Sequence, residues 1–393
     1  MAAADPASAS PLRIAHLVPS YLPRLGGMEV AVARLAGEMR QRGHAVEVLT
    51  QSEDPRLPHL ETIDGVLVRR FPVARHGGDS ALAPGLWSHL RRHGVGHQII
   101  HAHNYHALPA LGALLAGAPL VFSPLFHGGG HTPFRRLLHV PYRTCGRILF
   151  HRARAVVCLC EAEAVMVRAH FPGTATIRVI PYGIDAHTIR AACPFPPALP
   201  VVLTTGRLVP HKGIALLVEA MAHLQGRYAL RIVGDGPQRA ALHAHCARSG
   251  LADPEILVGR VDEAVLHRWL RTAAVAVYLS RHESYGLSLL ESLAAGRPVV
   301  AADIPAFREH LRFATIGQLR LVPPDLAPEA LARAIDEAAR SAPIEAESST
   351  PAPHLLAMRD RYGNPDTCGS TPALPTWDET VEQTLALYVS VLR

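Results

Sequence analysis

One repeated unit limits the folds that this sequence can adopt: a short apolar run, a loop that contains glycine, and an amphipathic stretch. The first copy begins with the apolar run 12–19 and passes through Gly26 and Gly27 into a stretch with helical spacing of its apolar residues. After the proline-rich segment 191–200, the pattern starts again at Val201. Apolar runs that alternate with amphipathic helices are typical of parallel sheets covered by helices on both faces. We therefore predict an α/β fold with two doubly wound, Rossmann-like domains.

The same pattern predicts the domain boundaries. Residues 376–393 regain helical spacing after a poorly periodic segment at 341–375, which is rich in Ser, Thr and Pro and which we interpret mostly as an irregular insertion. In chain order, we predict a disordered tail over 1–11, an N-terminal domain over 12–190, a linker over 191–200, a C-terminal domain over 201–375, and a last helix over 376–393 that packs back on the N-terminal domain.

The composition excludes several classes of protein. Of the 393 residues, 49% are hydrophobic and 18% are charged, which is typical of a well-packed globular protein. No apolar run approaches the roughly 20 residues of a membrane span, and the first residues lack the features of a secretory signal. Six cysteines without paired spacing favour a reducing, cytoplasmic location. The net charge of +6 suits anionic small molecules or an anionic membrane surface, and no motif indicates nucleic-acid binding.

The most informative stretch follows the apolar run 275–279, which predicts a buried strand. Residues 283–286 then predict a strand-to-helix turn, the position at which open α/β sheets bind ligands. Gly286 lets a ligand approach the backbone, and the free amides of the first helical turn predict an anion site. Glu283 and Glu291 flank that site as acceptors for sugar hydroxyls. The stretch therefore indicates a nucleotide-sugar site, and the alternative is a capped helix with a surface glutamate.

Two cations lie in the loop after the first strand of the second domain. Arg207 and Lys212 flank a turn that precedes a helix N-terminus, which makes a compact cationic site for a diphosphate. Since this loop falls at the ligand end of a strand, we favour that function over ordinary surface charge. The loops at 234–237 and 259–262 lie on the same edge of the sheet and can frame a base and a ribose.

The N-terminal domain carries further candidates. Gly26 and Gly27 can bring amides against a phosphate or sugar, although a plain tight turn fits them equally well. His127 stands beside three glycines at the end of a strand, where it can orient a sugar hydroxyl, unless it is a loop histidine without a role. His101 and His103 share one face of a strand without a third ligand, so we favour pocket lining over metal binding.

The stretch 133–154 is both arginine-rich and amphipathic. A helix of this kind can contact anionic lipid, so we keep peripheral membrane contact as an alternative. We favour an ordinary domain helix with a solvated basic face, because the apolar spacing fits packing on a sheet.

Taken together, these motifs resemble a known family. The chain resembles the GT-B glycosyltransferases of the large retaining family 4 from about residue 12 to its end, and this implies two Rossmann-like domains that face a central cleft. The matching motifs are Gly26-Gly27-Met28-Glu29, Phe126-His127, residues 181–185, Gly206-Arg207 with Lys212-Gly213, Gly234-Asp235-Gly236-Pro237, and the pair Glu283 and Glu291. The departures are Tyr182 in place of the usual Asn, residues 318–321 in place of a glycine-rich lead, and the long segment 341–375.

The resemblance implies a role for each motif residue. Arg207 and Lys212 resemble the pair that grips the donor diphosphate, and Val261 resembles the residue that lies against the base. Glu283 resembles the donor-sugar contact and Glu291 the ribose contact. The implied catalytic residues are His127, Arg207, Lys212 and Glu283, and the implied nucleotide-sugar-binding residues are Gly26, Gly27, Val261, Ser284, Gly286, Leu287 and Glu291. Neither metal ligands nor a cofactor are implied.

The implied reaction moves a hexosyl group from a UDP- or GDP-sugar to a hydroxyl of a glycan, lipid or small metabolite, with retention of configuration. The sequence has no Asp-x-Asp element, so we expect cations and amides to stabilise the leaving diphosphate without a metal ion. The composition favours cell-envelope or natural-product glycosylation. The alternatives are a catalytically weak nucleotide-sugar-binding protein, a membrane scaffold, and a GT-B sugar-nucleotide epimerase, for which no carboxylate cluster stands near His127.

Overall fold

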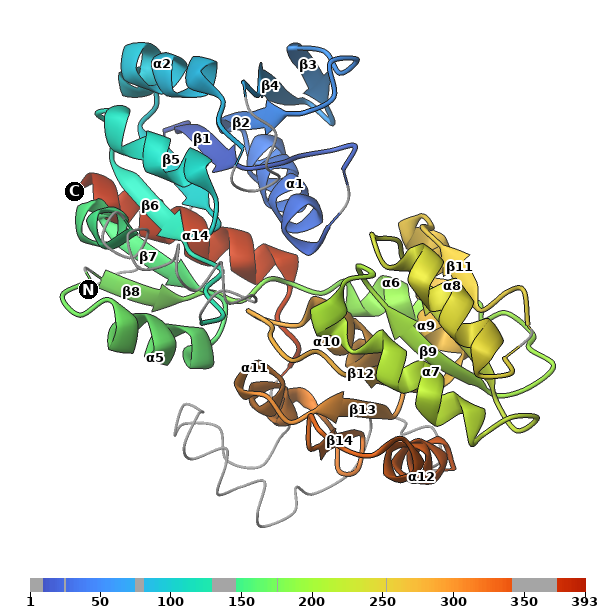
Figure 1. Cartoon of the computed structure of the whole chain (residues 1–393). Coiled ribbons are helices and arrows are strands. Elements are labelled where there is room, and N and C mark those ends of the chain that lie inside the picture. Colours follow the sequence, from blue (N-terminus) through green and yellow to red (C-terminus); the bar gives the residue numbers. More distant parts are fainter. Residues whose placement is uncertain are drawn as a thin grey trace. The chain divides into compact units, whose positions relative to one another are not determined.

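The contacts of the chain divide it into two compact units (Figure 1). The computed structural model describes residues 10–24, 26–74, 81–128, 146–174, 176–251, 253–340 and 373–393. The first unit comprises residues 1–159, 163–181 and 377–393, and the second comprises residues 160–162 and 182–376. The units thus separate after Pro181, whereas the sequence analysis placed the end of the first domain at residue 190. Parts of three predicted segments lie outside the described residues, namely 1–9 of the tail, 133–145 of the arginine-rich stretch and 341–372 of the insertion.

The first unit is built on an eight-stranded sheet. Its strands are β1 (Arg13–Val18), β2 (Ala45–Ser52), β3 (Leu60–Ile63), β4 (Val66–Pro72), β5 (Ile99–His103), β6 (Leu120–Ser123), β7 (Ala155–Cys158) and β8 (Thr176–Val179). They lie in the order β3-β4-β2-β1-β5-β6-β7-β8, and every neighbouring pair is parallel except β3 and β4. Inner strands such as β5 are buried along their whole length, which explains their nearly continuous apolar runs.

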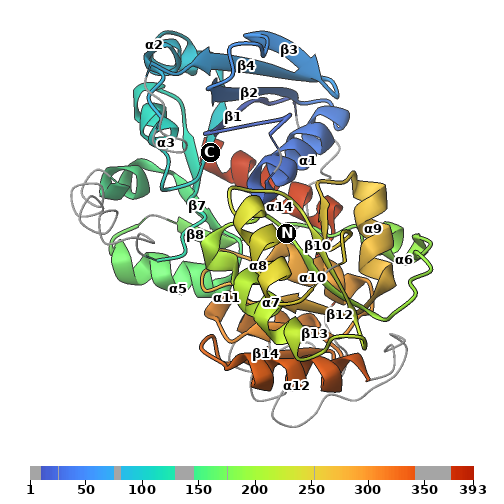
Figure 2. The same ribbon diagram turned by 45° about the vertical axis from the view of Figure 1, so that its right-hand side comes forward.

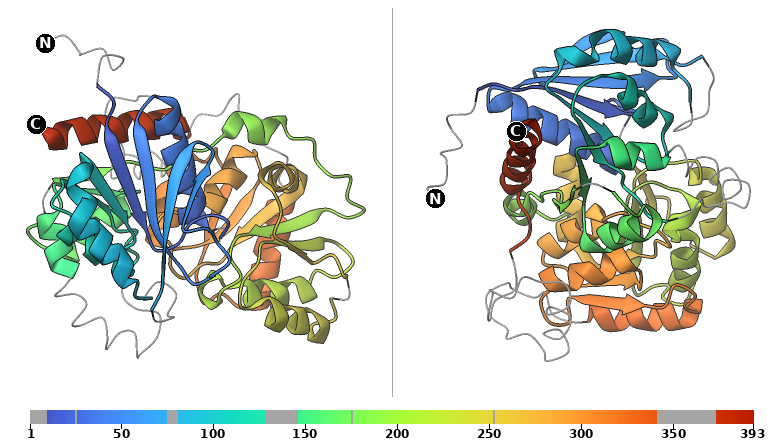
Figure 3. Two further views of the ribbon diagram at one scale, coloured as in Figure 1. Left: turned by 90° about the horizontal axis from the view of Figure 1, so that it is seen from above. Right: turned by 90° about the vertical axis from the view of Figure 1, so that its left-hand side faces the viewer.

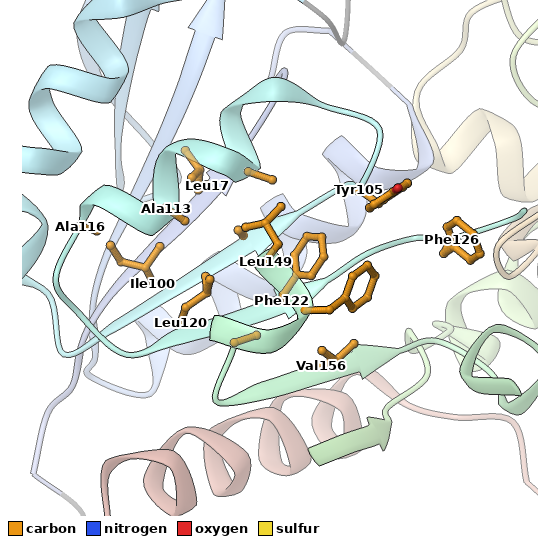
Figure 4. Close-up of a cluster of buried hydrophobic side chains, with 14 of the residues drawn as sticks. Leu17, Ile100, Tyr105, Ala113, Ala116, Leu120, Phe122, Phe126, Leu149 and Val156 are labelled. Atoms are coloured by element: carbon orange, nitrogen blue, oxygen red, sulfur yellow. The ribbon is translucent and has the colours of Figure 1, made fainter. Parts of the chain in front are cut away.

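Helices cover both faces of this sheet. They are α1 (Gly27–Gln41), α2 (Pro84–His93), α3 (Leu108–Gly112), the helical residues 146–152 of the predicted arginine-rich stretch, residues 163–170 of α5 (Glu161–His170), and α14 (Trp377–Leu392), with the short 3-10 helices η3 (Gly94–Gly96) and η4 (Ala113–Leu115). Strand alternation places Leu17, Ile100 and Phe122 on the face that carries α2 and α3 (Figure 4). Ile14 and Val18 point to the opposite face, where α14 lies beside α1 (Figure 3).

The second unit contains a six-stranded, fully parallel sheet. Its strands are β9 (Val201–Thr205), β10 (Ala229–Val233), β11 (Leu257–Gly259), β12 (Ala273–Tyr278), β13 (Val299–Ala302) and β14 (Leu319–Val322). Their order is β11-β10-β9-β12-β13-β14. The chain therefore builds outward in one direction from β9 to β11, and then returns to the other side of β9 with β12. Sheets of this type bind ligands beyond the carboxyl ends of the strands at that reversal.

Helices also cover both faces of the second sheet (Figure 2). The apolar core on one face joins α7 (Ile214–Ala222), α8 (Arg239–Arg248) and α12 (Pro328–Ala339). On the other face, α6 (Ala186–Ala191) contacts both α9 (Glu263–Thr272) and α10 (Leu287–Ala294). The remaining helices are α11 (Pro305–Glu309) and the 3-10 helices η5 (Pro210–Lys212) and η6 (His310–Phe313). The prediction of two doubly wound α/β domains is confirmed.

Candidate active site

Three loops of the second unit meet at the strand reversal between β9 and β12. The loop after β9 bonds to the loop after β10, because the Leu208 amide donates to the Asp235 carbonyl at 3.0 Å. It also bonds to the segment after β12, where the Arg281 amide donates to the His211 carbonyl at 2.8 Å. Backbone hydrogen bonds thus hold the three loops together at the ligand end of the sheet, as the sequence analysis expected.

Glycine is required where these loops approach most closely. Gly234 has φ +137°, and a Cβ there would lie 2.0 Å from the Gly206 carbonyl oxygen. Gly213 has φ +68°, and a Cβ there would lie 2.4 Å from the Leu279 carbonyl oxygen. A side chain at either position would push two backbones apart, so both glycines fix the spacing of the loops.

Lys212 and Glu283 form an ion pair at this edge. The Lys212 ammonium contacts Oε1 of Glu283, and the Ser280 hydroxyl donates to the same oxygen at 2.7 Å. Burial alone would raise the pKa of Glu283, but the charge of Lys212 and the hydrogen bonds from Lys212 and Ser280 lower it overall. Glu283 is therefore ionised at neutral pH, with one carboxylate oxygen held by the protein.

The first turn of α10 comes shortly after Glu283 in the chain and lies near Lys212. Gly286 takes the left-handed conformation with φ +93°, and its carbonyl accepts from the amides of Leu289 and Leu290. No described residue accepts a hydrogen bond from the backbone N–H groups of Gly286, Leu287 or Ser288. A Cβ on Gly206 would lie 3.8 Å from Ser288 Oγ and 4.0 Å from Lys212 Nζ. The Lys212 ammonium and the Ser288 hydroxyl of the first helical turn thus lie near the same point beside Gly206, and a cation next to a helix N-terminus is an arrangement that binds phosphate.

Glu291 lies further along α10 and is half-buried. Burial raises the pKa of its carboxyl to about 7, and the negative charges of Glu263 and Asp185 add to the increase. A hydrogen-bond donor or a positive charge beside this carboxyl would stabilise its ionised form, and the ribose contact of Glu291 stays a prediction.

The other predicted residues of this unit differ in exposure and in contacts. Arg207 is exposed, and no ion pair joins it to any residue in the described part of the chain. Val261 is half-buried in the loop between β11 and α9, and the next residue, Asp262, caps α9 by accepting from the Val265 amide at 2.8 Å. Ser284 is half-buried, and its carbonyl accepts from the Cys160 thiol at 3.3 Å.

Gly26 and Gly27 lie at the N-terminus of α1 in the first unit. A Cβ on Gly26 would lie 2.4 Å from Oε2 of Glu29, whereas a Cβ on Gly27 would have no neighbour within 4 Å. Glu29 is buried, and the Ser20 hydroxyl donates to its Oε1. The carboxylate therefore lies against Gly26, and its negative charge disfavours an anion at this side of the helix terminus, whereas Gly27 is open.

His127 follows β6 in the first unit and is half-buried. Its ring stacks on the ring of His106, with centroids 4.9 Å apart and an angle of 21° between the planes. The preceding amide, that of Phe126, donates to Oε1 of the buried Glu163 at 2.6 Å, which fixes the loop to the start of α5. His106 was missed by the sequence analysis, because nothing in its spacing relates it to His127.

A third histidine joins His101 and His103. His16 on β1 is the register partner of His101 on β5, and the three rings are buried on one face of the sheet, with possible ligand atoms within 4.8 Å of one another. They can hold a metal ion only after rearrangement. Both nitrogens of His101 are already hydrogen bonded, to Tyr388 at 2.6 Å and Ser123 at 2.7 Å, and its ring stacks on that of His103. Burial lowers the pKa of all three histidines, and that of His16 to about 4.

Solved structures share the fold of this chain. Sucrose-phosphate synthase from Thermosynechococcus elongatus matches with a TM-score of 0.73 at 20% identity, over 96% of this chain and 99% of that chain. HepE from Anabaena, solved in complex with UDP-glucose, matches with a TM-score of 0.68 at 20% identity, over 96% of this chain and 100% of that one. The fold is therefore that of the GT-B glycosyltransferases.

Sequence comparisons define the family. Residues 25–188 match the model "Glycosyltransferase Family 4", and residues 199–341 match "Glycosyl transferases group 1". A phosphatidyl-myo-inositol mannosyltransferase of Mycobacterium tuberculosis is 32% identical over 82% of this chain and 86% of its own length. A GDP-mannose:cellobiosyl-diphosphopolyprenol alpha-mannosyltransferase of Komagataeibacter xylinus is 28% identical over 86% of both chains. The chain belongs to glycosyltransferase family 4. Among its described residues, no helix is both long and apolar enough to cross a membrane.

Proposed function

We infer that this glycosyltransferase moves a hexosyl group from a nucleoside-diphosphate sugar to a hydroxyl acceptor, with retention of configuration and without a metal ion. The observation that carries this inference is the ion pair of Lys212 and Glu283 beside the free amides at the start of α10. A cation and helix amides bind the diphosphate, while the ionised carboxylate of Glu283 accepts from a sugar hydroxyl.

The chemical step breaks the bond between the anomeric carbon and the β-phosphate oxygen, and forms a bond from the acceptor oxygen to the same carbon. Negative charge develops on the departing diphosphate, and preorganised donors stabilise that charge as it appears. Lys212 and the amides of Gly286 and Leu287 supply these donors, and exposed Arg207 adds a second cation. Retention is implied by the family resemblance, and in a single displacement it needs attack from the face that the diphosphate leaves, so the acceptor proton passes to the departing phosphate oxygen. His127 then binds a hydroxyl of the donor sugar.

The names of relatives favour one donor. Two of them are described as mannosyltransferases, one with GDP-mannose in its name, and their named acceptors are lipid-linked. We therefore place GDP-mannose first among the donors to test, and a lipid-linked alcohol at a membrane surface first among the acceptors. UDP remains the alternative nucleotide, since HepE was solved with UDP-glucose.

The test has two stages. Thermal unfolding is measured with GDP, UDP, ADP or TDP, each with and without EDTA, because a ligand at 100 times its Kd stabilises a fold by about 2.7 kcal/mol. We expect one diphosphate to raise the melting temperature equally in both conditions. The matching sugar nucleotide is then supplied with an acceptor alcohol, and NMR of the product reports the anomeric configuration.

Each other outcome contradicts a stated part of the proposal. Loss of the shift with EDTA would contradict metal independence. Binding without turnover would favour a catalytically weak binding protein, and conversion of the donor sugar without an acceptor would favour an epimerase.

A further inference from the structure

A buried histidine stands behind the turn that begins α10. His310 is 1% exposed, and its Nε2 lies 2.6 Å from the Tyr285 carbonyl oxygen. A carbonyl only accepts, so Nε2 carries the proton and donates it. The ring also meets the Tyr285 ring edge-on, with centroids 5.0 Å apart. His310 begins η6, so a neighbouring segment of the second unit holds the turn from behind.

The bond to Tyr285 determines where the next amide points. The peptide between Tyr285 and Gly286 is trans, and a trans peptide directs its C=O and N–H groups in opposite directions. Because the carbonyl points to His310, the Gly286 N–H points away from it. That N–H has no acceptor among the described residues, and it is followed by the free amides of Leu287 and Ser288.

Packing closes the space on the His310 side. A Cβ on Gly286 would lie 2.6 Å from Cε1 of Phe307 and 3.6 Å from Nε2 of His310. A ligand therefore cannot reach the turn from that side. Burial lowers the pKa of His310 to about 4, so the ring is neutral at physiological pH and adds no charge behind the anion site.

We propose that His310 is a positioning residue for donor binding, which holds the Tyr285–Gly286 peptide so that the Gly286 amide faces the donor diphosphate. This inference rests on the proposed function of the α10 turn. Without the bond, the peptide can rotate, and its carbonyl can then face the phosphates in place of its N–H. The sequence offers no sign of this role, because His310 lies far along the chain from the turn.

The test compares three variants of the full chain. His310→Leu removes the N–H group that donates to the Tyr285 carbonyl. His310→Gln restores an N–H donor, since the Gln amide nitrogen is as many bonds from Cβ as Nε2 of histidine. Gln318→Met is the matched control: Gln318 is 3% exposed and donates to the Leu293 carbonyl at 2.9 Å, at the opposite end of α10. The control thus loses this buried bond at the far end of the same helix, together with the bonds of Gln318 to Arg297 and Thr315, and leaves the amides at the start of the helix untouched.

The dissociation constants of GDP and UDP are measured by calorimetry, together with the melting temperature of each variant. We expect His310→Leu to weaken binding of the preferred diphosphate at least about tenfold. The reason is that the Gly286 N–H no longer donates to the charged diphosphate. His310→Gln should stay within about threefold of the parent chain, and Gln318→Met should be destabilised without a change in affinity.

The outcomes separate this inference from the proposed function. If the parent chain binds neither diphosphate, the proposed function fails and this inference fails with it. If the parent chain binds and His310→Leu binds equally well, only this inference is wrong. Equal weakening by His310→Leu and Gln318→Met would also overturn it, since general destabilisation would then account for the loss. Should His310→Leu not fold, His310→Asn replaces it, because its amide is one bond too short to reach the Tyr285 carbonyl.

Discussion

Lys212 is the only lysine in this chain, and its ammonium group is held by Glu283 beside the start of α10. In the proposed reaction, it stabilises the charge of the departing diphosphate. Lys212→Ala should therefore lower kcat by about 10²–10³-fold, the usual effect of removing one preorganised donor. Steady-state turnover with the preferred sugar nucleotide measures this effect.

Arg227→Ala serves as the control for Lys212→Ala. Arg227 is a half-exposed cation of the same unit that pairs with Asp336, and its loss should leave turnover unchanged. Turnover of the Lys212 variant close to that of the parent chain would rule out the assigned role.

Glu291 gives the stability of the protein a distinct dependence on pH. Its folded pKa is raised to about 7, so the folded state binds the proton more tightly than the unfolded state does. Stability is therefore lost as pH rises from about 4.5 through 7. Glu291→Gln, which is uncharged, should match the parent chain at pH 5 and exceed it by about 1–2 kcal/mol at pH 8, a range reduced for partial exposure.

Urea denaturation at the two pH values measures this difference. The control is Glu382→Gln, which changes an exposed glutamate on α14 and should show no difference between pH 5 and pH 8. A Glu291→Gln variant without added stability at pH 8 would mean that the carboxyl is solvated.

A contact between two residues was predictable only where the order of the strands places both residues at the same edge of the sheet. Lys212 and Glu283 follow neighbouring parallel strands, so their proximity follows from the strand pattern. His310, Ser280 and His16 were missed, because packing or local turns place them and no motif spacing marks them. Asp185 and Glu263, which raise the pKa of Glu291, stand at the N-termini of α6 and α9, and the sequence does not specify how these helices lie relative to α10.

Among the elements, the loops after β9 and β10 depend on contact between two backbones. Gly234→Ala would place a methyl group 2.0 Å from the Gly206 carbonyl oxygen, so the loops must separate. We expect a loss of about 3 kcal/mol in the free energy of unfolding, together with weaker diphosphate binding. Gly226→Ala is the control: Gly226 also has positive φ, but a Cβ there meets nothing within 4 Å, so it should cost only about 1 kcal/mol.

The face of the first sheet that carries three histidines should make the protein sensitive to acid. The pKa of His16 falls to about 4 when the chain folds, so the unfolded state binds a proton more readily. Stability is complete above about pH 6.5 and is lost as pH falls toward 4, by up to ~1.4 kcal/mol per pH unit for each histidine.

His16→Leu should reduce that slope by about one proton, measured by denaturation between pH 4 and pH 7. The exposed His243 provides the control, since His243→Leu should leave the slope as it is. An unchanged slope in His16→Leu would show that His16 is protonated in the folded state.

At the scale of the whole molecule, the last helix belongs to the first unit. Tyr388 of α14 is fully buried, and its hydroxyl bonds to His101 Nδ1. Tyr388→Ala should lower the free energy of unfolding by about 3–5 kcal/mol, whereas Leu392→Ala on the exposed end of the helix should cost little. Hydrogen exchange should locate the loss in β1, β5 and β6, and faster exchange throughout the second unit would contradict this assignment.

The architecture of both units was predictable because strand and helix periodicities alternate without interruption along most of the chain. The end of the first unit was harder to place. Helix α6 has six residues, too few for a clear period, and it joins the second unit through contacts with α9 and α10. These contacts join residues that are distant in the sequence, so no local sequence pattern predicts them.

The position of α14 also has a consequence for biosynthesis. Residues 377–393 leave the ribosome after the whole second unit, yet they cover a face of the first sheet, whose strands emerge before that unit. Translation proceeds at about 5–20 residues per second, so that apolar face stays exposed to solvent while the entire second unit is translated. The second unit can close around its own sheet before the first is complete, so the order of folding reverses the order of synthesis. A nascent chain stalled within the second unit should therefore recruit chaperones to its N-terminal part.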